Sequence, residues 1–118
     1  MKGQRAKHEL LFSYGTLQME KVQMSTYGRL LSGKSARVNG YRLEMLNITN
    51  KDVIETSGLA QHPVAVKTGL KNDFIDGTCF ELTGEELYKT DIYENSDYLR
   101  ESTSMDSGES VWIYVKKA

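Results

Sequence analysis

The chain has 118 residues, of which 39% are hydrophobic and 26% are charged, and 15 basic against 16 acidic residues give a formal net charge of −1. A chain of this length can bury a core without disulfides or metals. We therefore expect one domain over residues 1–118, with its core at about residues 9–116. The near-neutral charge argues against nucleic acid or an anionic membrane surface as a partner.

Three features of the sequence indicate the cellular compartment of the protein. No apolar run approaches the roughly 18 residues that a membrane-spanning helix needs. The basic residues 1–7 are followed by an apolar stretch of only Leu10-Leu11-Phe12, which is too short for a signal peptide. Cys79 is the single cysteine, so no intramolecular disulfide can form. We expect a cytoplasmic protein, and the pattern specifies no oligomeric state.

The first half of the chain alternates between short apolar runs and glycines. Residues 9–14 predict a buried strand, because the apolar residues in it are consecutive. Residues 17–27 match neither helical nor strand periodicity, which leaves a loop or a short helix. Gly28, Gly33 and Gly40 predict tight connections between short strands.

The later elements are more sharply marked. Residues 38–45 predict one or two strands, and further strands are expected at 53–54, 63–66, 74–82, 98–105 and 111–115. Thr83-Gly84-Glu85-Glu86 is a capping box that opens a helix running to about Tyr93. Asn95 is expected to end this helix with a positive φ. Many short strands with one or two short helices predict an α+β protein with a mixed, barrel-like sheet.

Two motifs can carry chemistry. Phe12-Ser13-Tyr14-Gly15-Thr16-Leu17 runs a strand into a turn, whose free N–H groups suit a small anion. About eighty residues later, Asp91-Ile92-Tyr93-Glu94 ends the predicted helix. Partial burial and the negative helix end would both raise the pKa of Glu94 above its reference value of roughly 4.3. The alternatives are a plain turn at the first motif and a solvated glutamate at the second.

These motifs, in this order and at this spacing, resemble the gamma-glutamyl cyclotransferase-like family over about residues 10–115. The resemblance implies a small mixed-sheet β-barrel and a cofactor-independent reaction on a small gamma-glutamyl substrate. In that reaction the substrate's α-amine attacks its own γ-carbonyl and releases 5-oxoproline and an amine. The resemblance implies that Glu94 is the general acid/base, and that the backbone of Tyr14, Gly15, Thr16 and Leu17 cradles the α-carboxylate.

The residues after Glu94 extend the resemblance. It implies that Tyr98 lines the pocket, where it would bond the substrate or orient Glu94. Arg100 either supports the site or pairs on the surface with Glu101 or Asp97. Asp91 either raises the pKa of Glu94 by repulsion or faces water, and we favour water.

The remaining reactive residues have simpler interpretations. His8 and His62 have no partners at metal-ligand spacing, so neither a zinc site nor a cofactor is expected. Cys79 is expected to be a small buried hydrophobe.

The chain also departs from the family pattern. Asn95 stands where the family usually has glycine, and residues 18–21 are neither clearly basic nor glycine-containing. Since that segment borders the expected pocket mouth, the leaving amine is not specified. The short chain argues mildly against glutathione itself. Two other functions stay open: a non-catalytic module that binds a small metabolite, and an amide hydrolase in which Glu94 activates water.

Overall fold

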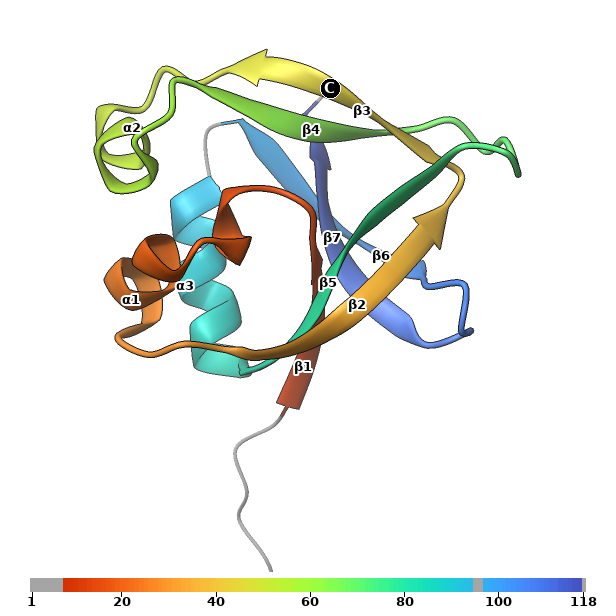
Figure 1. Ribbon diagram of the computed structural model, residues 1–118, viewed down its shortest axis with the longest axis horizontal. Helices are drawn as coiled ribbons and strands as arrows, with labels where there is room; N and C mark the ends of the chain where they lie inside the picture. The colour runs from red at the N-terminus through yellow and green to blue at the C-terminus, as the bar shows by residue number, and fades with distance from the viewer. Residues whose placement is uncertain (1–7, 95–96, 118) are drawn as a thin grey trace, which may run out of the picture.

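A computed structural model describes residues 8–94 and 97–117. Its strands form a curled, half-open barrel, and its three α-helices gather on one side of it (Figure 1). The predicted α+β fold with a mixed, barrel-like sheet is confirmed. In chain order the elements are β1 (His8–Ser13), η1 (Thr16–Gln18), α1 (Glu20–Tyr27), β2 (Ser32–Asn39), β3 (Tyr41–Asn47), α2 (Lys51–Ser57), β4 (Gln61–Lys67), β5 (Phe74–Thr83), α3 (Gly84–Glu94), β6 (Tyr98–Ser104) and β7 (Ser110–Lys116).

The sheet divides at β7. The strand order is β2-β5-β1-β7-β4-β3, and β6 pairs with β7 along the full length of that strand. The other edge of β7 is shared by two parallel strands. First β1 pairs there, at Phe12 with Ile113, and then β4, at Ala65 with Val115. β1 therefore leaves β7 where β4 joins it, and the sheet splits at that point.

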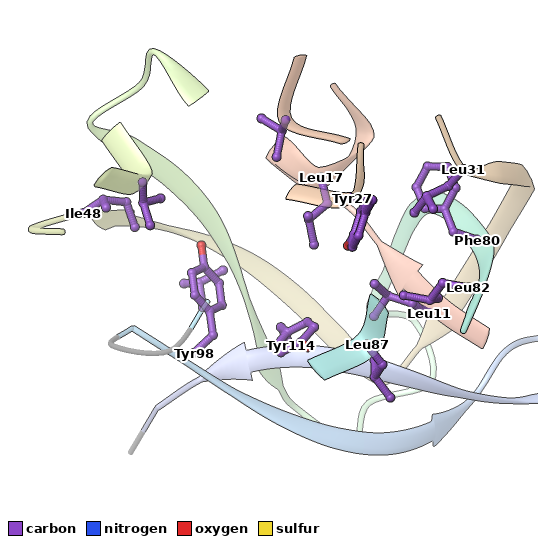
Figure 2. Packing of buried hydrophobic residues seen from close by; sticks show 13 residues of the cluster. Leu11, Leu17, Tyr27, Leu31, Ile48, Phe80, Leu82, Leu87, Tyr98 and Tyr114 are labelled. Atoms are coloured by element: carbon purple, nitrogen blue, oxygen red, sulfur yellow. The ribbon is translucent and has the colours of Figure 1, made fainter. Parts of the chain in front are cut away.

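Strand β7 buries side chains on both faces of the sheet, because successive side chains of a strand point to opposite faces. On β7, Val111, Ile113 and Val115 join an inner cluster, whereas Tyr114 joins a cluster beneath the helices. Figure 2 shows the helix-side cluster, which brings together side chains from β1, β5, β6, β7 and the helices. Its buried members are Leu11, Leu17, Val22, Tyr27, Leu31, Ile48, Val53, Val64, Phe80, Leu82, Leu87, Tyr98 and Tyr114. The helices are thus held against the sheet by apolar burial.

The predicted capping box at the start of α3 is confirmed, and both of its hydrogen bonds are present. The Glu86 N–H donates to Thr83 Oγ1 at 3.1 Å, and the Thr83 N–H donates to Glu86 Oε1 at 2.9 Å. The helix then continues to Glu94, one residue beyond the prediction. The prediction for Asn95 lies outside the described residues.

The strand predicted at residues 53–54 is wrong, because these residues lie in α2. Two β-branched side chains favour a strand, but the flanking residues favour a helix. The Asn50 side chain accepts hydrogen bonds from the N–H groups of Asp52 and Val53 at 2.9 and 3.3 Å. Gly58 ends the helix with φ 79°. These caps outweigh the weak strand preference of two residues.

The ambiguous segment 17–27 contains the end of η1 and the helix α1. Gly40 makes the turn between β2 and β3 with φ 85°, a conformation that glycine adopts without a steric cost. The turn predicted at Gly33 is wrong, since this residue lies within β2, where a Cβ would collide with the ring of Phe80. The helices of the described chain are three rather than one or two, and none is long and apolar enough to cross a membrane.

Candidate active site

A pocket lies at the split in the sheet. Its empty space is about 310 Å³, a figure that includes open solvent at its mouth. Strands β1, β4, β6 and β7, the loop after β1 and the end of α3 all contribute to it. The lining residues are Phe12, Ser13, Tyr14, Gly15, Thr16, Leu17, His62, Pro63, Glu94, Tyr98 and Tyr114.

The structure brings six of the seven predicted site residues together in this one pocket. The loop residues 14–17, Glu94 and Tyr98 all line it. Arg100 does not line it. Residues about eighty positions apart in the sequence therefore meet as the two motifs require.

Tyr14 holds the split together. Its hydroxyl donates to the Tyr114 carbonyl and accepts a hydrogen bond from the Ala65 N–H at 2.8 Å. Tyr114 lies between the β7 residue that pairs with β1 and the one that pairs with β4. The hydroxyl thus supplies hydrogen bonds where the ladder changes partners. Burial raises the pKa of Tyr14 far above its ordinary value, so this hydroxyl stays protonated.

The loop after Tyr14 presents backbone donors. Within the described part of the chain, the N–H groups of Gly15, Thr16 and Leu17 donate no hydrogen bond. A Cβ at Gly15 would sit 3.4 Å from Pro63 Cγ, so glycine lets the loop pack closely on β4. The hydroxyl of Thr16 lies 2.9 Å from that of Tyr93, which ties the loop to the end of α3. The loop is therefore anchored on two sides while its amides remain available.

Tyr98 contributes its ring to the pocket, but its hydroxyl is already used. That hydroxyl donates to the Pro63 carbonyl at 2.7 Å and so links β6 to β4. Burial, reinforced by the charge of Glu94, raises the pKa of Tyr98. Direct contact between Tyr98 and a substrate stays a prediction.

Glu94 is the carboxylate of the pocket. It is half-buried at the end of α3, and its carboxylate accepts no hydrogen bond from residues 8–94 or 97–117. Burial, followed by the negative charge of Asp97, raises the pKa of Glu94 to about 8. Its charge in turn raises the pKa values of Tyr14 and Tyr98. Glu94 is thus a carboxyl group that exchanges protons near neutral pH.

Asp91, one turn earlier, has a different environment: its side chain faces water in part, being 34% exposed, and is otherwise held by hydrogen bonds. Its two oxygens accept hydrogen bonds from Arg100 Nε at 2.7 Å and Arg100 Nη2 at 3.1 Å, and Oδ1 also accepts one from the Tyr114 hydroxyl at 2.6 Å. Arg100 stacks on Trp112, with its guanidinium carbon 4.3 Å from the ring centroid. Arg100 therefore pairs with Asp91 rather than with Asp97 or Glu101, and it fixes α3 on strands β6 and β7.

The sequence analysis missed His62, Pro63 and Tyr114 as lining residues. His62 is only 2% exposed, and its Nε2 atom lies 3.0 Å from the hydroxyl of Ser57. Burial lowers the pKa of His62, so the ring is neutral at neutral pH. The sequence does contain a signal for His62, because this histidine directly precedes a proline in an apolar strand. A search for metal-ligand spacing alone does not detect it.

The pocket does not suit a metal ion. Its lining holds one carboxylate and one imidazole, fewer than the three protein ligands of a typical catalytic zinc site. Across residues 8–94 and 97–117, no three His, Cys, Asp or Glu side chains gather where they could hold a metal. Cys79 is buried in the inner cluster, as predicted, and burial raises its pKa.

Comparison with known proteins identifies the family. A sequence model described as gamma-glutamyl cyclotransferase, AIG2-like matches residues 11–118. The chain belongs to this family. No curated protein matches it in sequence.

Solved structures share the fold of this family member at low identity. A protein of Arabidopsis thaliana is 20% identical, with a TM-score of 0.71, and the match covers 98% of this chain and 66% of the other. An uncharacterized Homo sapiens protein is 16% identical, with a TM-score of 0.72, over 94% of this chain and 68% of the other. A structure named gamma-glutamyl cyclotransferase is 15% identical, with a TM-score of 0.68, over the same shares of 94% and 68%. The chain thus spans about two thirds of the length of these neighbours.

Proposed function

We propose that this protein is a gamma-glutamyl cyclotransferase that converts a small gamma-glutamyl compound into 5-oxoproline and a free amine. The observation that carries the proposal is Glu94. It is a carboxyl group with a pKa of about 8 and no hydrogen-bond partner among the described residues, and it shares a pocket with a loop of unpaired N–H groups. Family membership supports the same conclusion.

The reaction needs little from the protein beyond binding and one proton carrier. Nucleophile and electrophile belong to the same substrate molecule, so their proximity is largely built in. Glu94 takes a proton from the α-ammonium group, and the freed amine attacks the γ-carbonyl carbon. The carbonyl oxygen becomes an oxyanion as the five-membered ring closes. When the oxyanion collapses, Glu94 returns the proton to the leaving nitrogen and the bond to that nitrogen breaks. The ring nitrogen, which still carries two hydrogens and a positive charge, gives its second proton to Glu94, and Glu94 passes it to the released amine, which leaves as an ammonium ion.

The raised pKa of Glu94 suits both halves of this cycle. A carboxylate with an ordinary pKa of roughly 4.3 is a weak base toward an ammonium group. At a pKa of about 8, the free energies of protonated and ionised Glu94 differ less near neutral pH than those of an ordinary carboxyl group. A group that acts first as base and then as acid requires such a small difference.

The substrate's carboxylate is assigned to the loop after β1. The N–H groups of Gly15, Thr16 and Leu17 make no hydrogen bond within the described chain, and consecutive backbone donors of this kind bind anions. None of the residues lining the pocket is lysine or arginine, so these amides are the donors we expect to hold the α-carboxylate.

The test is to incubate the purified protein with a panel of gamma-glutamyl amino acids and amines and to identify products by mass spectrometry. We expect 5-oxoproline from the wild type and a loss of roughly 10²-fold or more in Glu94→Gln, which keeps the shape and removes the base. Free glutamate instead of 5-oxoproline would indicate an amide hydrolase. Ligand binding without any product would indicate a binding module, and either result would overturn the proposal.

A further inference from the structure

His62 is a pocket residue that the reaction described above does not use. It lies on β4, across the split from the loop after β1, and it lines the same pocket as Glu94. The side chain is 2% exposed, so it is not a surface histidine.

Most hydroxyl groups around the pocket are already engaged within the protein. The Tyr14 hydroxyl donates to the Tyr114 carbonyl and accepts from the Ala65 N–H. The Tyr98 hydroxyl donates to the Pro63 carbonyl, and the Tyr114 hydroxyl donates to Asp91. The Thr16 hydroxyl faces that of Tyr93. Among the described residues, the polar groups left for a substrate are the loop amides, the Ser13 hydroxyl beside them, Glu94 and His62.

One edge of the imidazole is held from outside the pocket. Ser57, the last residue of α2, is 1% exposed, and its Oγ lies 3.0 Å from His62 Nε2. The same hydroxyl accepts a hydrogen bond from the Leu59 N–H at 3.2 Å. Its own hydrogen can then be donated to Nε2 or to the Leu59 carbonyl, which is 3.3 Å away. The first arrangement places the ring proton on Nδ1. The second, which also agrees with the hydrogen bond between His62 and the Leu59 backbone, places it on Nε2.

The other edge of the ring has no partner among the described residues. His62 Nδ1 makes no hydrogen bond within the described residues, and no fully buried side-chain nitrogen or oxygen there lacks a partner. Nδ1 must therefore keep some accessible surface, and the cavity that His62 lines is the pocket. With the ring proton on Nδ1, the protein presents one neutral N–H donor on the β4 side.

We propose that His62 donates its Nδ1–H to the γ-carbonyl oxygen of the substrate and stabilises the oxyanion that forms when the ring closes. This rests on the proposed function. No bond to His62 forms or breaks: the oxygen gains negative charge as the amine attacks, accepts the hydrogen bond more strongly, and loses that charge on collapse. A neutral imidazole is a suitable donor, because it polarises a carbonyl without placing a positive charge beside Glu94.

Two conservative substitutions separate this role from a structural one. The side-chain amide of asparagine reaches about the position of Nδ1, whereas that of glutamine reaches about the position of Nε2. We expect His62→Gln to lower kcat by roughly 10²-fold with KM little changed, because it keeps the Ser57 contact and loses the pocket donor. His62→Asn should retain at least about tenfold more activity than His62→Gln, since it keeps the donor.

Two further variants serve as the control and as the alternative if a His62 variant does not fold. His8→Gln is the matched control, since His8 is exposed, pairs with Glu81 at 3.2 Å and lies at the other end of β1 from the pocket. It should leave kcat unchanged. If a His62 variant fails to fold, as judged by thermal unfolding, Ser57→Ala keeps the imidazole and removes its partner. That variant should lower kcat by about tenfold without changing KM, because the Nδ1–H tautomer is no longer favoured.

The possible outcomes separate the two proposals. A loss in Glu94→Gln together with unchanged kcat in folded His62 and Ser57 variants would remove the role of His62 and leave the cyclotransferase standing. An effect confined to KM, or activity kept by glutamine and lost by asparagine, would also overturn the oxyanion role. A wild-type protein that forms no 5-oxoproline would overturn both proposals.

Discussion

Two carboxylates one turn apart on α3 have opposite surroundings. Asp91 accepts three hydrogen bonds, two from Arg100 and one from the Tyr114 hydroxyl. Glu94 accepts none from the described residues, and burial raises its pKa to about 8. The functional group and the helix are the same for both. The presence or absence of partners decides which carboxylate holds the fold together and which is available for proton transfer.

The difference follows from what each turn of the helix faces. At Asp91 the helix faces β6 and β7, which supply an arginine and a tyrosine hydroxyl. At Glu94 it reaches the split where β1 leaves β7 and β4 joins it. The split exposes a loop and a proline-containing strand start, and neither brings a cation. The branching of the sheet thus creates the environment of Glu94.

The largest expected contrast is in turnover. Glu94→Gln should lower kcat/KM for 5-oxoproline formation by roughly 10²-fold or more, because the proton carrier is lost. Asp91→Asn keeps that group, and we expect it to lose no more than about tenfold. Rates of product formation, measured on variants shown to be folded by circular dichroism, provide the comparison. Equal losses in two folded variants would mean that the two carboxylates do not have separate roles.

The second contrast is in the pH dependence of the reaction. Glu94 must be ionised to accept a proton, and its pKa is about 8. We expect kcat/KM to rise about tenfold per pH unit below pH 8 and then to level off. Asp91→Asn should keep the same profile. A profile that is already flat between pH 6 and 8 would argue against a raised pKa for Glu94.

The third contrast is in stability as a function of pH. Native Glu94 keeps its proton up to about pH 8, whereas in the unfolded chain it loses that proton near its ordinary pKa of about 4.3. Between these values the native state binds more protons, so Glu94 lowers the free energy of unfolding as the pH rises. Glu94→Gln should therefore match the wild type near pH 4 and exceed it by roughly 2–4 kcal/mol at pH 9.

Urea unfolding at both pH values measures this difference. An advantage of Glu94→Gln that is the same at pH 4 and pH 9 would argue against a raised pKa, because a packing effect does not follow the titration of the carboxyl group.

The fourth contrast concerns the anchoring of α3. Asp91→Asn should lower the free energy of unfolding by roughly 1.5–3 kcal/mol, because Arg100 and Tyr114 lose the charged acceptor and one of its two oxygens becomes an amide donor. Asp76→Asn is the matched control, since Asp76 forms a similar pair with Arg37 at 2.7 Å but is 63% exposed at its side chain. That variant should cost less than about 1 kcal/mol. Equal costs would mean that Asp91 is no more than a surface ion-pair partner.

The smallest expected effect is at Tyr98. Tyr98→Phe removes the hydrogen bond to the Pro63 carbonyl and keeps the ring that lines the pocket. We expect a loss of about 1 kcal/mol in the free energy of unfolding and little change in kcat. A large loss of kcat without loss of stability would show instead that this hydroxyl contacts the substrate.

Local signals in the sequence were sufficient where one short segment contains its own determinants. The capping box at Thr83 and Glu86 predicted the start of α3, and it forms both of its hydrogen bonds. The strand at Val53 and Ile54 was predicted wrongly, because strand preference was read without the caps at Asn50 and Gly58. That information was also local, and a search for helix caps would have found it.

The partners of polar side chains could not be predicted in this way. Arg100 and Asp91 are nine residues apart, on a helix and a strand, and Tyr114 reaches the same carboxylate from another strand. His62 enters the pocket because β4 takes the place of β1 along β7. Nothing in the sequence near these residues specifies such neighbours.

The sequence by itself determined the family, the α+β class and the two segments that meet in the pocket, since these depend on motif, periodicity and order along the chain. The tertiary structure decided which of two nearby carboxylates is free and what occupies the tyrosine hydroxyls. It also decided that a histidine stands beside the site. Burial and hydrogen-bond partners are properties of side chains that meet through folding, and they set the pKa of Glu94, on which the proposed chemistry depends.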